Sequence, residues 1–380
     1  MRFRRRPTRR ALVTVAATAA ALGCAVPAGA VPAPAGTAPA SAVARFHTAG
    51  RVEASSGGYV SYSWPGVYFE GRFRGTGVGI VLDDSANDYD VQIDGATSAT
   101  LLTPGTTTYW VKGLADGVHS VRLVKRTEST GAVGRFGGFT AAPGGAILPA
   151  PRARHRRIEF IGDSYTAGYG NVSGTRDCST NGGVERNSDA DLSFGALTAK
   201  SLGADYQLNA YSGRGMVRNY NGGDPGTDFR TYYDRALIDV PGDVWKVPRD
   251  WRPQVVVVGL GINDFSTALH PGERWTSTDD LVSAYESAYQ GFLDKLRARY
   301  GPRTQIVVSA TAVYGTTAFA EAAQQVVRDR NARGDSRVGY WYYDDPTLDH
   351  LGCDWHPSAH DDQVISGLLD TYLASLHLRW

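Results

Sequence analysis

The stretch VVVVGL, residues 255–260, constrains the fold of this chain most, because it contains no polar side chain. A strand that is apolar on both faces needs cover on both faces, as in a parallel sheet between two layers of helices. Further strands are predicted at Ile158–Ile161, Tyr206–Ala210, Ile306–Ser309 and Gly339–Tyr343. Residues 157–380 are therefore predicted to form a doubly wound, three-layer α/β domain.

Helical patterns lie between these predicted strands. Ser277 and Asp280 fit a capping box at the start of one helix. The apolar residues that follow share one face of that helix: Leu281, Tyr285, Ala288, Phe292 and Leu296. Residues 357–376 are predicted to form a terminal helix that begins with proline. Helices of this kind would supply the outer layers of the α/β domain.

Residues 45–140 have a different pattern. Short stretches rich in valine and aromatic residues recur there, and no helical pattern separates them. Pro65-Gly66 marks a turn and Asp94-Gly95 is a hairpin signal. Such strands predict an all-β sandwich or jelly roll. Residues 141–156, AAPGGAILPAPRARHR, are predicted to link this domain to the α/β domain.

Residues 1–30 are predicted to be a signal peptide. A basic segment, MRFRRRPTRR, precedes the apolar segment ALVTVAATAAALG, which is too short to span a bilayer comfortably. Ala28-Gly29-Ala30 offers a cleavage site, and residues 31–44 form a Pro/Ala linker. The protein is therefore expected to be secreted.

Two features of the signal segment leave the export route open. Thr8-Arg9-Arg10-Ala11-Leu12-Val13 is similar to a twin-arginine signal, so that either Sec or twin-arginine export is expected. Cys24 raises the alternative of a lipoprotein anchor, although the leucine of Leu22-Gly23-Cys24 stands one place too close to the cysteine.

Cysteine usage agrees with an oxidising compartment. Once the signal segment is removed, Cys178 and Cys353 remain, and they are predicted to form a disulfide. The alternative is two separately buried thiols. The formal net charge of +1 gives no electrostatic reason to expect nucleic acid or an anionic membrane as a partner.

Four short motifs fall where a parallel sheet places its functional residues, at or near the carboxyl ends of strands. The first is Gly162-Asp163-Ser164, after the first predicted strand of the α/β domain. The others are Ser212-Gly213-Arg214-Gly215, Gly259-Leu260-Gly261-Ile262-Asn263-Asp264 and Asp354-Trp355-His356-Pro357. Each of the first three follows a predicted strand, and the last precedes the terminal helix.

Together these motifs resemble the SGNH, or GDSL-type, esterase superfamily. The resemblance implies a flavodoxin-like parallel sheet in the three-layer domain. The stretch from Trp64 to Phe73, with Tyr89–Gly95 after it, further resembles the β-sandwich that precedes the esterase domain in carbohydrate esterase family two. Ile158–Asn171 is similar to the same family. These enzymes remove acetyl groups from plant cell-wall polysaccharides, and the resemblance covers nearly all of the mature chain.

The resemblance implies roles for the motif residues in acyl transfer. Ser164 is the expected nucleophile, and His356 is the expected base that takes and returns its proton. His350 and His360 are fallback candidates for the base. The oxyanion donors are expected to be the backbone N–H groups of Ser164 and Gly213 and the side-chain amide of Asn263. Gly213 as a plain turn glycine and Asn263 as a helix cap are the alternatives.

The third member of the triad departs from the superfamily pattern. The pattern D-x-x-H would place Cys353 where an aspartate belongs, while Asp354 stands two residues before His356. We expect Asp354 to reach the imidazole by a different backbone path. The alternative is a Ser-His dyad in which a backbone carbonyl orients the ring. Asp163 is expected to hold the turn at the serine rather than to act as a base.

Aromatic residues are the candidates for sugar binding. Trp355 is expected to stack on a sugar ring, and packing under the loop is the alternative. Weaker candidates of the same kind are Tyr169, Tyr211 and Trp245. No metal-ligand spacing and no phosphate loop is present in the sequence, so neither cofactor nor metal is expected.

The signal segment and this resemblance together imply a secreted serine esterase that removes O-acetyl groups from xylan or glucomannan through an acyl-enzyme on Ser164. Its expected partner is acetylated polysaccharide or oligosaccharide, and a monomer is expected. A lipase or broad esterase on the same scaffold is one alternative, which an apolar lid would favour. A carbohydrate-binding protein without activity is the other, and the complete set of Ser164, Asn263 and His356 argues against it.

Overall fold

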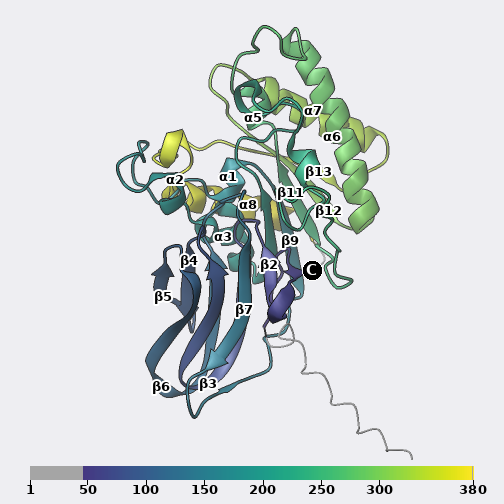
Figure 1. Ribbon diagram of the computed structural model, residues 1–380. Helices are drawn as coiled ribbons and strands as arrows, with labels where there is room; N and C mark the ends of the chain where they lie inside the picture. Colours follow the sequence, from purple (N-terminus) through teal and green to yellow (C-terminus); the bar gives the residue numbers. More distant parts are fainter. Residues whose placement is uncertain (1–45, 379) are drawn as a thin grey trace, which may run out of the picture. The chain divides into compact units, whose positions relative to one another are not determined.

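The computed structural model describes residues 46–378 and 380. These residues belong to one compact unit that contains two β-sheets (Figure 1). The predicted signal peptide, the whole Pro/Ala linker and Cys24 lie outside the described residues. No helix in the described part of the chain is long and apolar enough to cross a bilayer.

The second sheet has five strands, all parallel, in the order β10-β9-β11-β12-β13. Their bounds are Arg156–Gly162 for β9, Ala204–Ala210 for β10, Val255–Gly259 for β11, Gln305–Thr311 for β12 and Val338–Tyr343 for β13. This order confirms the predicted doubly wound domain. After β9 the chain forms its neighbour on one side, β10, and after β11 it forms its neighbour on the other side, β12. The connections that leave β9 and β11 therefore run to opposite sides, and a crevice opens beyond the carboxyl ends of these two strands.

Helices cover both faces of this sheet (Figure 1). Helices α3 (Phe194–Ser201) and α8 (Ala359–Ser375) pack on each other over β9, β10 and β13, whereas α6 (Thr278–Tyr300) and α7 (Ala318–Ala332) pair over the other face. The side chain of Ser277 caps α6 by accepting from the backbone N–H of Asp280. The shorter helices are α1 (Ser164–Ala167), α2 (Gly183–Arg186), α4 (Phe229–Tyr232) and α5 (Ile262–Phe265).

The first sheet is antiparallel and has the order β1-β2-β7-β3-β6-β4-β5, with β8 beside β3. Its strands are β1 (Glu53–Ala54), β2 (Val60–Tyr62), β3 (Tyr68–Asp84), β4 (Tyr89–Ile93), β5 (Ala96–Leu101), β6 (Gly105–Lys125), β7 (Gly134–Ala141) and β8 (Ala146–Ile147). The long strands β3 and β6 pair along their whole length, with a shift of register between Gly75 and Gly77. Strand β7 pairs with the second half of β3, and β4 pairs with the second half of β6. The rings of Phe69 and Phe136 stack with their centres 4.3 Å apart in the buried core of this domain.

The predicted domain limits remain a prediction, and β8 lies within the segment expected to be a linker. The remaining regular segments are 3₁₀ turns: Ser56–Gly58, Ala190–Leu192, Tyr220–Gly222 and Cys353–Trp355. Polar contacts join the sandwich to the α/β sheet. Arg122 on β6 forms a two-pronged ion pair with Asp191 at 2.8 Å for each bond, and buried Arg51 pairs with Glu159 on β9 at 3.0 Å.

Candidate active site

Ser164 lies at the first position of α1, directly beyond the carboxyl end of β9. The carboxylate of Asp163 caps this helix by accepting from the backbone N–H of Tyr165 at 3.1 Å, as expected for a residue that holds the turn. Gly162 permits the turn because a Cβ there would lie 2.1 Å from Oγ1 of Thr166. The serine side chain is therefore fixed at the end of a buried strand.

His356 lies against this serine. Its Nε2 is 2.8 Å from Oγ of Ser164, and its Nδ1 is 2.9 Å from the carbonyl oxygen of Cys353. A carbonyl only accepts, so Nδ1 carries the proton and Nε2 is free to accept from the serine hydroxyl. Burial lowers the pKa of His356 below its ordinary value of 6.5, so the ring is neutral and basic near neutral pH.

Asp354 does not take the place that a triad would give it. Its carboxylate accepts from the hydroxyl of Tyr169 at 2.9 Å, while the imidazole contacts the carbonyl of Cys353 instead. The reason is the backbone, since Asp354 has a left-handed conformation (φ 52°) in the turn before His356. The arrangement is a Ser-His pair whose imidazole is oriented by a backbone carbonyl, which was the alternative to a triad with Asp354. The side chain of Asp354 acts on His356 through its charge, which raises the pKa of the ring, as do the backbone contacts of Cys353 and Asp354.

Asn263 and Gly213 border the same crevice. The side-chain amide of Asn263 donates to the carbonyl of Arg214 at 3.0 Å and to Oδ2 of Asp163 at 3.3 Å. Gly213 has a φ of 76°, which favours glycine. The carboxylate of Asp264 fixes the loop that follows Gly213. It accepts three hydrogen bonds, each of 2.8 Å, from the backbone N–H groups of residues 216–218. The residues expected to supply the oxyanion donors thus line the same cleft as Ser164.

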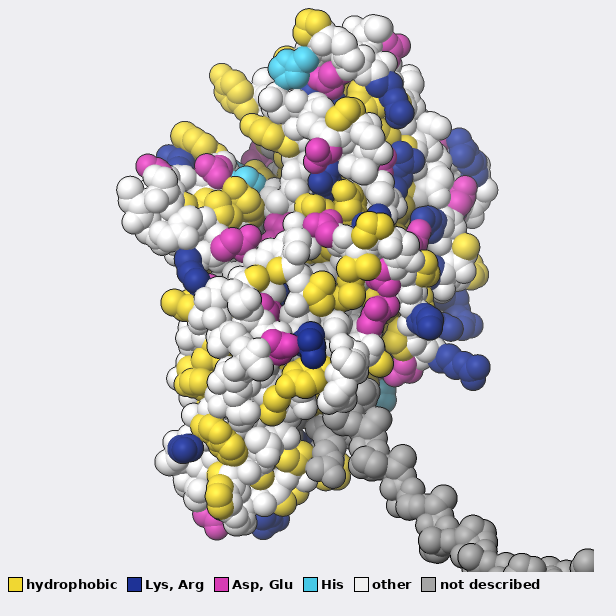
Figure 2. Space-filling model, in the orientation of Figure 1, with side chains coloured by type: hydrophobic (Ala, Val, Ile, Leu, Met, Phe, Trp, Pro, Cys, Tyr) yellow, Lys and Arg dark blue, Asp and Glu magenta, His cyan; other side chains and the backbone are white. Residues whose placement is uncertain are grey.

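These residues line a cleft of about 580 Å³. Its wall also contains Tyr165, Tyr169, Ser212, Tyr220, Ile262, Ser266, Ala312, Val313, Tyr314, Asp354 and Trp355. Trp355 is 65% exposed, and Tyr314 is fully exposed. Figure 2 shows a hollow at the upper left of the view with hydrophobic side chains on its borders. Exposed aromatic rings beside the serine suit a ligand with flat apolar faces, such as a sugar ring.

Trp355 is held from one side. The guanidinium of Arg176 lies 3.6 Å from the centre of its ring, and Arg176 is itself fixed by bonds to the carbonyls of Asp349 and His350. Such stacking leaves the tryptophan exposed but ordered. The alternative of a tryptophan packed under the loop does not describe this exposed ring.

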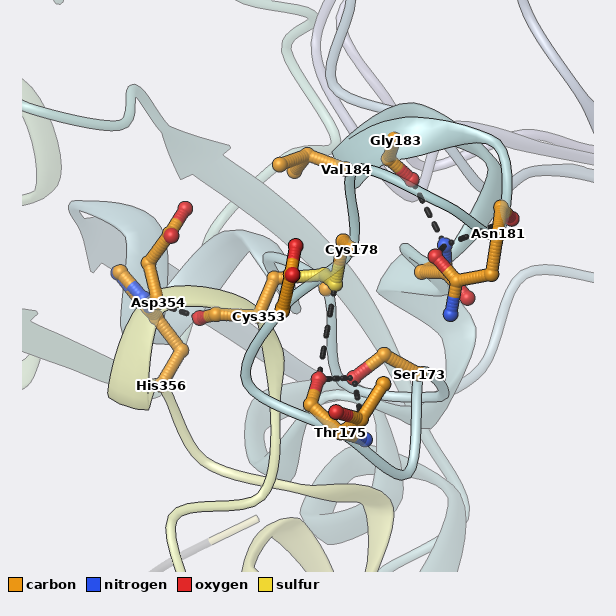
Figure 3. The surroundings of a disulfide bond; sticks show 12 residues. Ser173, Thr175, Cys178, Asn181, Gly183, Val184, Cys353, Asp354 and His356 are labelled. Atoms are coloured by element: carbon orange, nitrogen blue, oxygen red, sulfur yellow. Dashed lines mark hydrogen bonds between the residues drawn. A yellow bond between two sulfur atoms is a disulfide. The ribbon is translucent and has the colours of Figure 1, made fainter.

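The predicted disulfide between Cys178 and Cys353 is present, with the two Cα atoms 5.6 Å apart. Figure 3 shows that it lies next to the hydrogen bond between Cys353 and His356. It joins the loop after the serine helix to the turn that carries the histidine. The backbone N–H of Cys353 also donates to the carbonyl of Gly170 at 3.1 Å, so this turn is held in two ways.

Of the weaker candidates for sugar binding, only one lies at the cleft. Tyr169 lines the cleft and lies against the imidazole, with ring centres 4.2 Å apart. Trp245 is buried against Arg51, and Tyr211 packs against Tyr232; neither lines the cleft. The fallback bases also lie outside it: His350 and His360. The structure therefore brings only His356 of the candidate histidines to Ser164.

One residue near the site was not anticipated. Glu128, in the segment between β6 and β7, accepts hydrogen bonds from the backbone and side chain of Ser212. Nothing in the sequence pattern links two residues that stand 84 positions apart in different domains. Asp264, by contrast, belongs to the same motif as Asn263. Its position next to Asn263 in the sequence could have identified it as a residue of the site.

Family models match both parts of the chain. A model described as carbohydrate esterase 2 N-terminal matches residues 48–151, and a model of the GDSL-like lipase/acylhydrolase family matches residues 160–378. An acetylxylan esterase / glucomannan deacetylase from Cellvibrio japonicus (strain Ueda107) is 40% identical over 331 residues, which cover 86% of this chain and 90% of the relative.

Two solved structures are similar to this chain over both of its domains. A carbohydrate esterase whose active site is described as having divergent catalytic and non-catalytic binding functions is 38% identical, with a TM-score of 0.80, over 87% of this chain and 97% of that chain. A family two carbohydrate esterase from Clostridium thermocellum, in complex with cellohexaose, is 30% identical, with a TM-score of 0.76, over 87% of this chain and 98% of that chain.

Proposed function

This chain belongs to the carbohydrate esterase 2 family of GDSL-like acylhydrolases, and from that premise we propose that it is a secreted serine esterase that removes O-acetyl groups from plant cell-wall polysaccharide. The relative from Cellvibrio japonicus acts, by its name, on acetylxylan and glucomannan. The observation that carries the proposal is the 2.8 Å contact between Oγ of Ser164 and Nε2 of His356 on the wall of an open cleft.

In the proposed first step, Oγ of Ser164 attacks the acetyl carbonyl carbon while its proton passes to Nε2 of His356. The carbonyl oxygen becomes an oxyanion, and its donors are the N–H groups of Ser164 and Gly213 and the amide of Asn263. When the tetrahedral intermediate collapses, the C–O bond to the sugar breaks and the sugar oxygen takes the proton from His356. The acetyl group remains on the serine.

The second half returns the enzyme to its starting state. Water gives a proton to Nε2 of His356 and attacks the acetyl-serine carbonyl. Collapse of this intermediate breaks the ester bond to Oγ, which regains the proton from the imidazole, and acetate leaves. The carbonyl of Cys353 keeps Nδ1 protonated through both halves, so that the same nitrogen, Nε2, always exchanges the proton.

The cleft supports a sugar polymer as the substrate. It is open, and the exposed rings of Trp355 and Tyr314 line its wall, where they are available to stack on sugar units of the polymer. We propose the accompanying organisation as well. Residues 1–30 direct export, and two domains, 45–140 and 157–380, form the mature enzyme.

The test compares acetate release from acetylated xylan, acetylated glucomannan and a triglyceride by the wild type and by Ser164→Ala. We expect release from one or both polysaccharides and its loss in Ser164→Ala, with affinity for the deacetylated sugar retained. Turnover of the triglyceride alone would instead show a lipase. Sugar binding without acetate release from the wild type would show a binding protein and end the proposal.

A further inference from the structure

Glu128 belongs to the sandwich, on the segment between β6 and β7. Its own backbone is fixed there, because the buried ammonium of Lys125 donates to the carbonyls of Ser63, Thr127 and Glu128 at 3.0, 2.7 and 2.7 Å. The hydroxyl of Thr127 donates in turn to the side chain of Asn87 at 3.0 Å. The loop that carries Glu128 is therefore a rigid part of the sandwich.

The side chain of Glu128 leaves the sandwich and ends in the α/β domain. It is only 9% exposed. Its Oε1 accepts the backbone N–H of Ser212 at 2.5 Å, and its Oε2 pairs with the Ser212 hydroxyl. Both donors of Ser212 are thus bound by one carboxyl group, and Ser212 itself lines the cleft.

The residue after Ser212 is the one expected to supply an oxyanion donor. The carbonyl of Gly213 accepts from the backbone N–H of Tyr220 at 2.9 Å. Glu128 holds the chain just before the peptide group between Ser212 and Gly213, and Tyr220 holds it just after. That peptide group contains the N–H of Gly213, and with both flanks bound its direction is determined.

We propose that Glu128 is a positioning residue of the esterase, through which the sandwich domain fixes the Gly213 N–H toward the oxyanion. The inference rests on the proposed function and deepens it, because it makes one catalytic site depend on both domains. The sandwich then does more than border the substrate. It completes the arrangement that stabilises the transition state, and a free α/β domain would lack this support.

The protonation state of Glu128 suits this role. Burial raises the pKa of this carboxyl to about 7, opposed by the hydrogen bonds from Ser212, and the carboxylate of Glu185 raises it further while the Lys125 ammonium lowers it. The ionised form accepts from both donors of Ser212. The neutral form accepts from the N–H and donates to the hydroxyl, so the geometry holds in either state. Glutamine is able to make the same two contacts, and alanine makes neither.

The experiment compares Glu128→Ala, Glu128→Gln and wild type in the full mature chain, with a small chromogenic acetate as substrate. The matched control is Arg154→Ala, because Arg154 joins the sandwich to β10 through Glu70 and Asp205, with bonds of 2.8 Å to each, and does not line the cleft. We expect kcat to fall about 10- to 100-fold in Glu128→Ala, as for a donor misplaced by about 1 Å, with KM little changed.

Glu128→Gln should restore most of kcat, and Arg154→Ala should lower the melting temperature without lowering kcat. The inference is overturned if kcat of Glu128→Ala equals that of Arg154→Ala. It is also overturned if Glu128→Ala changes only KM and leaves kcat at the wild-type value. If Glu128→Ala does not fold, Ser212→Ala decides, since it removes one of the two contacts, and an unchanged kcat would overturn the inference. An inactive wild type would instead remove the proposed function itself.

Discussion

The carbonyl oxygen of Cys353 orients the imidazole of His356 through a bond of 2.9 Å, and the same cysteine is covalently tied to Cys178. In a Ser-His-Asp triad a carboxylate does this and also stabilises the imidazolium. A neutral carbonyl supplies the orientation and the tautomer but no charge. The position of the histidine therefore depends on how firmly the backbone around residue 353 is held.

The first prediction concerns the disulfide. Cys178→Ser leaves the carbonyl of Cys353 in the chain but frees its turn, so we expect both stability and kcat to fall. Loss of a native disulfide typically costs about 2–5 kcal/mol. Thermal unfolding and acetate turnover measure the two effects. Wild type treated with a reductant should behave like the variant. Full activity in the folded, reduced protein would contradict the role given to this bond.

The second prediction concerns Asp354, which bonds Tyr169 and not the imidazole. Loss of a true triad aspartate costs about 10⁴-fold in kcat. We expect Asp354→Asn to cost far less, below roughly tenfold, because only a charge near the ring is lost. A fall approaching the triad value would show that the carboxylate contacts the imidazole during turnover.

The same variant gives a pH test with a defined sign. Activity requires neutral His356, so kcat/KM rises with pH through the pKa of this ring. Burial lowers that pKa below 6.5, and the charge of Asp354 raises it in part. Removing the charge should therefore move the acidic limb of the kcat/KM profile to lower pH. A shift to higher pH would contradict this electrostatic role.

Much of the fold was predictable because the signals were local. The run of valines at 255–258 is a strand buried on both faces, and each of the first three motifs followed its strand. The parallel sheet agrees with the predicted doubly wound domain, and Oγ of Ser164 lies 2.8 Å from Nε2 of His356. Periodicity and turn chemistry act over a few residues, so they can be read from sequence.

The parts that were not predictable depend on long-range geometry. Whether Asp354 reaches the imidazole is decided by two consecutive left-handed backbone conformations, at Asp354 and Trp355, which the neighbouring sequence does not reveal. The contact between Glu128 and Ser212 depends on how the two domains dock, and no periodic pattern encodes that docking. Both cases lie at the site, where local preference is overridden most often.

The third prediction concerns the joint between sandwich and sheet. Burial raises the pKa of Asp205 on β10, but hydrogen bonds and charges from His47, Arg154 and Tyr68 outweigh it and lower the pKa from 3.8 to about 2. A lowered carboxyl pKa adds stability above pH 3.8, and that stability is lost as pH falls through about 2. We expect Asp205→Asn to reduce the free energy of unfolding at pH 7 by about 2 kcal/mol.

The difference between Asp205→Asn and wild type should shrink as pH falls from about 4 to about 2, since the wild-type carboxyl then takes up its proton. Denaturant unfolding at a series of pH values measures this. Activity of the folded variant should be unchanged because Asp205 lies far along β10 from the cleft residues. A difference that stays constant with pH would assign the loss to packing instead of charge.

The last prediction concerns Trp355, which is 65% exposed and backed by Arg176. If its free face stacks on a sugar ring, Trp355→Ala loses roughly 1 kcal/mol of binding, which is about a fivefold increase in KM. The increase should appear with acetylated xylan or glucomannan and not with a small chromogenic acetate, which has no sugar ring to stack on the tryptophan. The matched control is Trp110→Ala, since Trp110 is an exposed tryptophan on β6, outside the cleft. An equal effect of Trp355→Ala on both classes of substrate would show that the tryptophan supports the histidine turn and does not bind the polymer.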